Sequence, residues 1–247
     1  MLVNGNQFYL DPYDELQLGG SGMHSHFLTN TIKNFLRPSD YVLDIGAFTG
    51  YFTTLFAHYA HYVYAFEPYK PLYDLLYKNA ACYDNISTYN LAVSNVSGKT
   101  NLFVKQGFLV DNRLSEVPGR EKVEVETIRV DDWNITLPIA FIKVDAQGSE
   151  GLIIDGMVEL LQSYHPVLVL ELSPYHLVHT DIPAEKLLKQ LRDLEYKIWN
   201  IDQEFWNVHP ATDEYLLKRY AVPTCTHTDI LCTWEGAPYG DCMVRGL

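Results

Sequence analysis

Basic residues are scarce in this chain of 247 residues, and they form no Lys/Arg cluster. There are 18 Lys and Arg against 31 Asp and Glu, which gives a formal net charge of −13 at pH 7. Because nucleic acids and anionic membranes attract proteins mainly through positive charge, we expect neither as a partner. No apolar run approaches the ~20 residues that a membrane-spanning helix needs, which also argues against a membrane protein.

Cysteine is rare as well, and the features of a signal peptide are lacking. The four cysteines form no C-x-x-C pair. The first 15 residues, MLVNGNQFYLDPYDE, have no basic start and no continuous apolar core. We therefore expect reduced thiols and a cytoplasmic protein.

Repeats, low-complexity tracts and clear linkers are absent, which favours a single domain over residues 1–247. We expect a lead-in and a helix in residues 1–37, followed by an α/β core in residues 38–247. Apolar runs alternate with amphipathic stretches in this core. The expected strands are 41–45, 62–66, 86–90, 100–105, 123–129, 138–144, 167–172, 196–201 and 229–234, and the expected helices are 24–36, 51–59, 68–80, 151–161 and 182–194. Residues 106–122 are predicted to be a mobile loop over a site, and Trp199 and Trp206 are expected in the core.

What the sequence does contain is a glycine turn at residues 41–51, YVLDIGAFTGY. An apolar run leads to Asp44, two glycines follow at positions 46 and 50, and a helical pattern begins at Thr49. Glycine adopts backbone angles that other residues avoid, and its missing side chain lets a ligand approach the backbone. The pattern predicts the strand, tight turn and helix that open a nucleotide-cofactor site in doubly wound sheets.

Polar residues end five of the expected strands: Asp44, Glu67, Asn90, Asp145 and Glu171. The carboxyl ends of parallel strands meet at one edge of a sheet, so we expect these side chains to converge on one crevice. Glu67 follows Asp44 by 23 residues, and an acid at that place accepts hydrogen bonds from ribose hydroxyls.

The turn does not match a dinucleotide or a phosphate site. GAFTG is one residue shorter between its outer glycines than G-x-G-x-x-G, it lacks the third glycine, and no Gly-Lys-Ser/Thr follows it. A cofactor that has a ribose but no pyrophosphate fits better. S-adenosylmethionine is the obvious one.

Five segments in order, LDIGAFTGYFTTLFA, AFEPYKPLYDLLYKNA, NLAVSNVSG, VETIRVDDW and FIKVDAQGSEGLIIDGM, resemble FkbM-type S-adenosylmethionine-dependent methyltransferases. The resemblance spans about residues 28–175, and its most specific parts are FEP and K-V-D-x-Q-G-x-E. It implies an α/β, Rossmann-like class I methyltransferase fold. That fold has a seven-stranded, mostly parallel sheet in the order 3-2-1-4-5-7-6, with helices on both faces. The family is mostly linked to O-methylation, often of sugar hydroxyls.

The resemblance also implies roles for residues of this chain. The cofactor loop corresponds to Asp44, Gly46, Ala47 and Gly50, the ribose ligand to Glu67, and the adenine segment to Asn90, Leu91 and Ala92. We add Phe48, Tyr51, Pro68 and Asp145 to the expected cofactor site. Lys143, Asp145, Gly148 and Glu150 match the second signature, and we expect Lys143 to pair with a neighbouring acid. Phe48 stands where the family usually has Asn, and Ser149 stands where His or an aromatic residue is common.

Methyl transfer to a hydroxyl needs an in-line acceptor and a group that removes its proton. Asp145 is the first candidate base, although it would equally serve to orient the cofactor's amino group, and Glu171 is the second. His26, with His24, His176 and His179, could reach the mouth of the site. A divalent metal such as Mg²⁺ held by Asp145 and Glu171 is a further hypothesis; no other metal site is predicted.

The sequence thus predicts an S-adenosylmethionine-dependent O-methyltransferase that acts on a hydroxyl of a sugar or glycan. Three alternatives stay open. The acceptor is a small phenol, a lipid or a protein; or it is a nucleic acid, which the charge disfavours; or the chain is a non-catalytic scaffold that kept the cofactor-binding fold. The expected partner is a small-molecule or saccharide acceptor, and the oligomeric state is not predicted.

Overall fold

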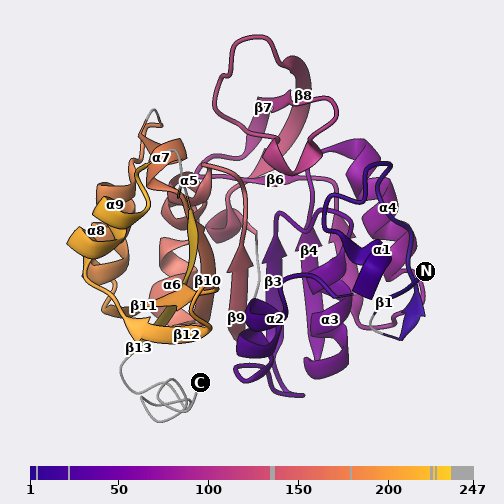
Figure 1. The fold of residues 1–247 in the computed structure, drawn as a ribbon, viewed down its shortest axis with the longest axis horizontal. Coiled ribbons are helices and arrows are strands. Elements are labelled where there is room, and N and C mark those ends of the chain that lie inside the picture. The colour runs from indigo at the N-terminus through magenta and orange to yellow at the C-terminus, as the bar shows by residue number, and fades with distance from the viewer. Residues whose placement is uncertain are drawn as a thin grey trace.

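A central sheet with helices on both faces forms the body of the molecule (Figure 1). The computed structural model describes residues 1–3, 5–21, 23–133, 137–178, 180–222, 225 and 227–234. Its sheet has eight strands in the order β12-β11-β13-β10-β9-β3-β4-β5. Their bounds are β3 Tyr41–Ile45, β4 Tyr62–Phe66, β5 Ile86–Tyr89, β9 Ile139–Val144, β10 Val167–Leu172, β11 Tyr196–Asp202, β12 Asn207–Pro210 and β13 Thr228–Trp234.

The sheet differs from the predicted seven-stranded one because an eighth strand, β12, pairs antiparallel with β11 at the edge. The strands β10, β9, β3, β4 and β5 are parallel to their neighbours in that series. β13 runs antiparallel between β10 and β11. The five strands that were predicted to end in polar residues therefore have their carboxyl ends at one edge of the sheet, as expected.

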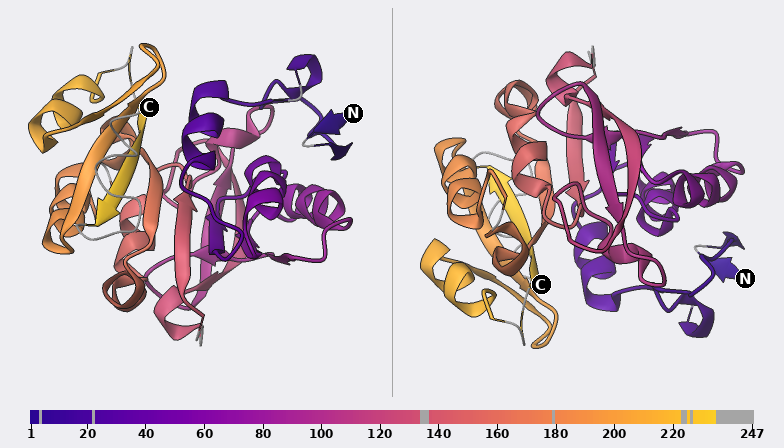
Figure 2. Two further views of the ribbon diagram at one scale, coloured as in Figure 1. Left: turned by 90° about the horizontal axis from the view of Figure 1, so that it is seen from below. Right: turned by 90° about the horizontal axis from the view of Figure 1, so that it is seen from above.

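Two apolar layers cover the sheet, and the period of two along each strand decides which side chain enters which layer. On one face, Val42 and Phe141 pack with the helices α2 His26–Lys33 and α3 Tyr51–Tyr59 and with the N-terminal lead-in. On the other face, Leu43 and Ile142 pack with α5 Glu150–Asp155, α6 Val158–Tyr164 and α8 Ala184–Asp193. Figure 2 shows the two layers from below and from above. The remaining helices of the main body are α4 Lys70–Ala80, α7 Pro174–Leu177 and α9 Asp213–Arg219.

The expected helix 151–161 is divided in two at Gly156 and Met157. A Cβ atom on Gly156 would lie 2.1 Å from the backbone oxygen of Ser94, so the chain passes too close there for any side chain. Helix α9 was not predicted. Its start carries a recognisable signal, since the side chain of Thr212 accepts the N–H of Tyr215 as an N-cap.

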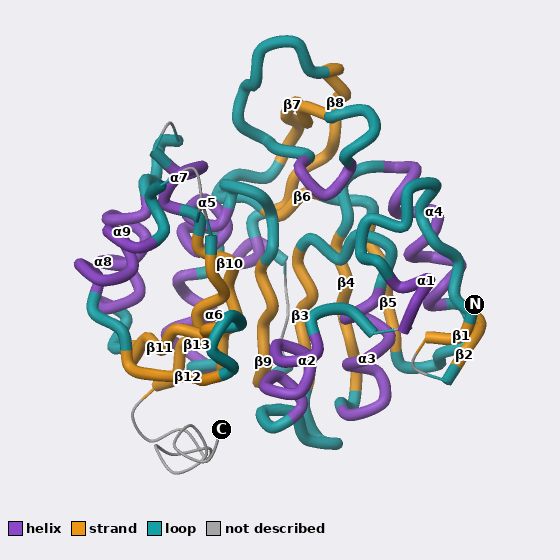
Figure 3. The backbone as a smooth tube through the Cα atoms, in the orientation of Figure 1, coloured by secondary structure: helices purple, strands orange, loops and turns teal. Residues whose placement is uncertain are grey.

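A small three-stranded sheet, β6-β8-β7, stands above the main sheet (Figures 1 and 3). It consists of β6 Ala92–Val93, β7 Gly98–Val104 and β8 Glu121–Ile128, and the connection between β7 and β8 contains the short 3₁₀ helix Leu109–Asp111. The lead-in contains β1 Leu2–Val3, β2 Asn6–Gln7 and α1 Leu18–Ser21. It is tied to the core through Asn79, whose side chain bonds the backbone of Tyr9 in both directions and also the carbonyl of Thr49.

Among the described residues, no helix is both long enough and apolar enough to cross a bilayer. Trp199 is 6% exposed, which agrees with its predicted place in the core. The same prediction is wrong for Trp206, which lies in the turn after β11 and is 66% exposed.

Candidate functional site

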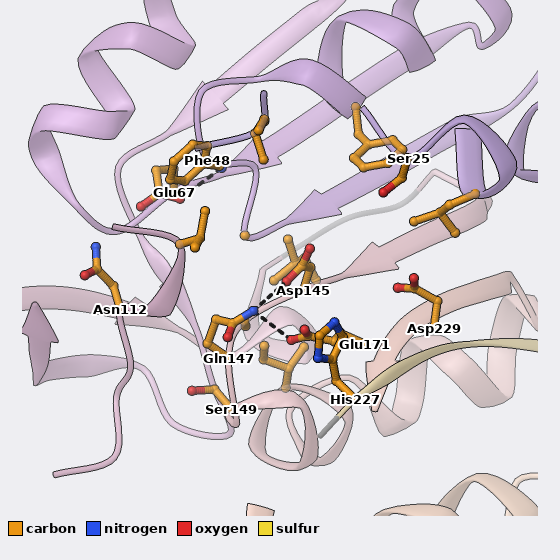
Figure 4. Close-up of a pocket in the computed structure, with 18 of the residues that line it drawn as sticks. Ser25, Phe48, Glu67, Asn112, Asp145, Gln147, Ser149, Glu171, His227 and Asp229 are labelled. Carbon is orange, nitrogen blue, oxygen red and sulfur yellow. Dashed lines mark hydrogen bonds between the residues drawn. The ribbon is translucent and has the colours of Figure 1, made fainter. Parts of the chain in front are cut away.

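A cavity of about 570 Å³ opens where the carboxyl ends of the parallel strands meet, in the size range of ligand pockets. Figure 4 shows its two walls. One wall follows β3, β4 and β5. The other follows β9, β10, β11 and β13. Of the predicted site residues, the lining includes Gly46, Phe48, Glu67, Pro68, Leu91, Ala92, Asp145 and Glu171.

The glycine turn after β3 is fixed by contacts on both sides. Gly46 and Ala47 donate their N–H groups to the carbonyl of Phe66, at 3.0 and 2.9 Å. Gly46 has φ +77°, and a Cβ atom there would lie 1.8 Å from the backbone oxygen of Asp145. Only glycine fits at this point, because both the backbone angle and the neighbouring chain exclude a side chain.

Glu67 ends β4 and is buried against that turn (Figure 4). One carboxyl oxygen accepts the N–H of Phe48 at 3.0 Å, and the other accepts the N–H of Tyr69 at 2.9 Å. Burial raises the pKa of Glu67 to about 8, even though the two N–H groups oppose the shift. Each oxygen keeps a second lone pair for a ligand in the cavity.

Phe48 lines the cavity with its ring and holds Glu67 with its backbone. Its φ is +53°, in the left-handed region that is unusual for an aromatic residue and that Asn tolerates well. This conformation gives a physical reason for Asn at the corresponding place in the family. In this chain the ring packs against Leu72, Leu102 and Leu109 instead.

Five of the predicted cofactor residues lie behind the lining. Asp44 is completely buried, and one of its oxygens accepts the hydroxyl of Thr53 at 2.6 Å. Its other oxygen, Oδ1, has no hydrogen-bond partner within the described part of the chain. Asn90 donates to the carbonyls of Glu67 and Pro68, at 2.9 Å each, and so shapes the end of β4. Ala47, Gly50 and Tyr51 are likewise buried and not among the lining residues.

The second signature, K-V-D-x-Q-G-x-E, folds into one hydrogen-bonded unit. Lys143 donates to Asp145 at 3.1 Å, which confirms the predicted pairing of Lys143 with a neighbouring acid. Gln147 donates to both Asp145 and Glu171, at 3.3 and 2.8 Å (Figure 4). The carboxyl group of Glu150 accepts the backbone N–H groups of residues 146 and 148, so it holds the loop rather than a ligand.

Lys143 is the cation around which the acids of this wall are arranged. It is 3% exposed and lies over the ring of Phe52, with its Nζ 4.8 Å from the ring centroid. The fields of Asp145, Asp44 and Asp229 outweigh its burial and raise the pKa of Lys143. For Asp145 burial acts upward, but Lys143 and the bond from Gln147 outweigh it, so the pKa of Asp145 is lowered. Asp145 is therefore an ionised carboxylate at neutral pH.

Glu171 has the opposite environment. It is 9% exposed, and burial together with the charge of Asp145 raises its pKa well above the ordinary value. Asp229 is its register partner on β13, and burial raises the pKa of Asp229 to about 7. Lys143 stabilises the ionised form of the carboxyl group that it contacts. The carboxyl groups that it does not contact retain their protons more readily. Two neighbouring acids with divergent pKa values are a frequent feature of acid–base sites.

Sequence reasoning missed several lining residues. Gln147 stood inside the quoted signature and could have been taken from it. Asp229 had no local signal, since only the pairing of β13 with β10 brings it beside Glu171. Glu15 comes from the lead-in and accepts the N–H groups of Leu109 and Val110, at 2.5 and 2.7 Å. Glu15 thereby holds the lead-in against the segment between β7 and β8. Residues 109, 110, 112 and 114 of that segment line the cavity as a loop over the site.

The histidines that line the cavity are not the ones that the sequence placed first. His26 is exposed at the start of α2 and does not line the cavity, so it is poorly placed as a base. His24 does line the cavity, and burial lowers its pKa. His227, which was not predicted, lines it from the position just before β13. His176 is not among the lining residues, and His179 lies outside the described residues.

A metal site is not supported by the geometry. Within the described residues, no group of three or more His, Cys, Asp or Glu side chains could hold a metal ion. Between Asp145 and Glu171 lies the amide of Gln147, which donates to both carboxyl groups.

Comparison with known proteins now decides the family. The sequence model of the methyltransferase FkbM domain matches residues 44–198, well over half of the chain. The chain belongs to the FkbM methyltransferase family. Its matched segment contains the glycine turn, Glu67, the second signature and Glu171. No curated protein matches the sequence.

Solved structures agree at the level of the fold. The FkbM methyltransferase of Methylobacillus flagellatus KT superposes with a TM-score of 0.50 at 16% identity, over 90% of this chain and 48% of that one. This FkbM chain thus spans about half the length of that protein. An rRNA methylase from Streptococcus thermophilus has the same TM-score at 10% identity, over 85% of this chain and 95% of that one. At these identities, the likeness is one of fold.

Proposed function

We propose that this FkbM family member transfers a methyl group from S-adenosylmethionine to a hydroxyl oxygen of a saccharide. The observation that carries the proposal is a single cavity with two unlike walls. The cofactor wall consists of Gly46, Phe48, Glu67, Leu91 and Ala92. The acceptor wall consists of Asp145, Gln147, Glu171, Asp229, the last residue of β11, Asp202, and the turn residues Gln203 and Glu204.

The cofactor wall suits a ribose-bearing ligand without a pyrophosphate. Glu67 offers an acceptor oxygen on each side for a pair of vicinal hydroxyls, and its backbone bonds fix the carboxyl plane. Next to this wall, Leu72 and Leu91 give apolar surface that an adenine ring can cover, and Leu102, which is in one apolar cluster with Leu72, extends it. We assign Glu67 to the ribose and these leucines to the base.

S-adenosylmethionine supplies an electrophilic methyl group when it is bound. The chain must hold the acceptor oxygen in line with that group and remove its proton. We assign proton removal to Glu171, because a carboxyl group with a raised pKa is the stronger base. Gln147 occupies Oε2 of Glu171, so the acceptor's proton is assigned to Oε1. This reverses the order of the two candidate bases expected from the sequence.

Asp145 then has an electrostatic task. It stays ionised beside Lys143, its side chain is 39% exposed to the cavity, and it follows directly on β9 at the seam between the two walls. A fixed negative charge there favours a sulfonium or the cofactor's ammonium group. It also disfavours a second negative charge nearby, which adds to the effect of burial in raising the pKa of Glu171.

The acceptor wall favours a neutral, hydroxyl-rich ligand. Its carboxyl and amide groups can accept and donate hydrogen bonds at several points, as a sugar requires. Its cation Arg219 already pairs with Glu204 at 3.1 Å. A phosphate group, as in a nucleic acid or a phospholipid, would meet Asp145, Asp202, Glu204 and Asp229.

The test has two arms. Calorimetry with S-adenosylmethionine and S-adenosylhomocysteine should give micromolar binding that Glu67→Ala weakens by about tenfold or more. Incubation with labelled cofactor and a panel of mono- and oligosaccharides, with and without EDTA, should then give a methyl ether. Binding without transfer to any saccharide, phenol, lipid or protein in the panel would favour a non-catalytic scaffold.

A further inference from the structure

The turn between β11 and β12 exposes two consecutive aromatic side chains. Phe205 and Trp206 are each 66% exposed, among the most exposed large apolar residues in the described part of the chain. An isolated exposed aromatic residue needs no explanation, but two adjacent exposed rings next to cavity-lining residues indicate a binding surface.

This turn is built to hold its shape. The Asp202 carboxyl group accepts the N–H groups of Glu204 and Phe205, at 3.1 and 3.0 Å. Gln203 donates to Asp229 at 2.7 Å, and Glu204 pairs with Arg219 of α9. Trp206 has φ +53°, a costly angle for a bulky residue that persists only where the surroundings impose it. The two rings are therefore presented by a braced turn.

The polar residues of the same turn line the cavity. Asp202, Gln203 and Glu204 belong to the acceptor wall, immediately before the two rings in the chain. The Trp206 ring lies 6.1 Å from the ring of Phe27 in α2, and the neighbours of Phe27 at positions 25 and 28 line the cavity from the opposite side. Figure 4 shows Ser25 and Asp229 on these two sides of the same opening. The two rings are not themselves lining residues. They follow directly on the lining residues of the β11–β12 turn, and Trp206 lies against α2.

The combination of groups selects one kind of ligand. Flat rings stack on the apolar faces of sugars, while carboxyl and amide groups bind the hydroxyl edges. A lipid would need a continuous apolar surface next to the rings, but the lining residues nearest to them in the chain, Gln203 and Glu204, are polar, and Gln203 donates to Asp229. RNA would need cations, and this side of the cavity carries mainly acids.

We propose that Phe205 and Trp206 form a stacking platform for the saccharide acceptor, with Gln203 and Asp229 binding its hydroxyl edge and directing one hydroxyl to Glu171. This inference rests on the proposed function and adds the residues that select the acceptor. Asp229 is assigned to the acceptor's hydroxyl edge because it is the register partner of Glu171 and lines the same cavity.

The experiment uses full-length protein carrying 5-fluorotryptophan and saturated with S-adenosylhomocysteine. The ¹⁹F resonance of Trp206 is assigned by its disappearance in Trp206→Phe. Cellotriose, xylotriose, maltotriose and chitotriose are titrated, with phosphatidylglycerol vesicles and poly(U) RNA as the competing classes. We expect a saccharide to shift the Trp206 resonance. Calorimetry with the same saccharide, which does not need the Trp206 signal, should show about tenfold weaker binding to Phe205→Ala and to Trp206→Ala.

Matched variants separate stacking from folding. Tyr77→Ala removes an aromatic side chain that is 61% exposed on α4, away from the cavity lining, and should leave saccharide affinity unchanged. Trp206→Phe should keep most of the affinity, because it keeps a stacking ring. Affinity for S-adenosylhomocysteine should be the same in all four variants, which shows that they are folded.

Three results would overturn the platform. Transfer to a saccharide with an unchanged KM in both alanine variants refutes the platform and leaves the proposed function standing. Transfer only to a non-saccharide acceptor refutes both the platform and the proposed function, whereas a Trp206 shift with vesicles or RNA alone refutes the platform. A change of mass in light scattering for Trp206→Ala, with no saccharide effect, assigns the patch to contact between copies of the chain.

Discussion

The two walls of the cavity are built in different ways. The cofactor wall comes from residues 46–92, where each strand delivers its end residue to the site and backbone N–H groups hold the one acid, Glu67. The acceptor wall collects residues from 145 to 229 across four strands, and side chains hold one another there. The first wall depends on local backbone geometry. The second depends on coupled charges, so substitutions should affect the two walls through different physics.

The largest effect is expected at the acceptor wall. Glu171→Gln removes the proposed proton acceptor but keeps the shape and the contact with Gln147, so turnover should fall by about 10²–10⁴-fold with unchanged cofactor affinity. In the unsubstituted enzyme, turnover should rise with pH, because the raised pKa of Glu171 keeps it protonated at low pH. Formation of S-adenosylhomocysteine over a pH series measures both. Glu159→Gln, at a side chain that is 74% exposed, is the control. Normal turnover in Glu171→Gln would remove Glu171 as the base.

The stability of the fold should be most sensitive where the two walls meet, at the contact between Gly46 and the carbonyl of Asp145. Gly46→Ala places a methyl group against the Asp145 carbonyl and forces Ala into a left-handed angle, at a cost of about 3 kcal/mol or more. Gly107→Ala is the matched control, because φ is +78° there and nothing lies within 4 Å of the added atom. It should cost only ~1–2 kcal/mol. Equal losses in urea unfolding would show that the close contact at Gly46 has no energetic weight.

At the cofactor wall, Glu67→Gln should weaken S-adenosylmethionine binding by about tenfold, the loss of a charge-assisted hydrogen bond of ~1.5–3 kcal/mol. Burial raises the pKa of Glu67 to about 8, while ribose hydroxyls favour its ionised form. Cofactor binding at pH 7 should therefore release up to about one proton.

Calorimetry in two buffers with different ionisation enthalpies measures this proton release. Glu67→Gln should abolish it, and Glu126→Gln, on the exposed side of β8, should not. Proton uptake, or the same release in Glu67→Gln, would contradict the assignment of Glu67 to the ribose.

The pH dependence of stability has a definite sign at the same residue. A carboxyl group whose pKa is raised on folding favours the folded state below its unfolded pKa, and this contribution is lost as the pH rises through about 8. Without cofactor, the protein should therefore become less stable relative to Glu67→Gln between about pH 4.5 and pH 8. Denaturant midpoints across that range check this, and a difference that does not vary with pH would contradict it.

The smallest effect is expected at Phe48. Phe48→Asn and Phe48→Ala both remove the ring, but Asn tolerates the left-handed angle better. The Asn variant should be more stable than the Ala variant by ~0.5–1 kcal/mol, measured by calorimetry. Both should bind S-adenosylmethionine more weakly than the parent, because the ring lines the cavity. If Ala is the more stable variant, the backbone angle at Phe48 is not the reason for Asn in the family.

The cofactor wall could be predicted from the sequence because its information is local. Tyr41–Ile45, the glycine turn and Glu67 are short segments whose hydrophobic period and glycine positions determine a strand end and a tight turn. The family signature likewise named Lys143, Asp145 and Glu150 in one stretch. The predicted pairing of Lys143 with an acid is confirmed. The contacts also show what the signature did not, that Glu150 holds a loop and that Asp44 lies behind the cavity lining.

Tertiary structure decided which residues join Asp145 and Glu171 in the acceptor wall. Asp229 meets Glu171 only because β13 inserts between β10 and β11, and Glu15 meets the β7–β8 connection across 94 residues of chain. The division of Asp145 and Glu171 into an ionised and a protonated carboxyl group depends on which of them Lys143 contacts. Burial and pairing set the energy of a charge, and neither can be read from neighbours in the sequence.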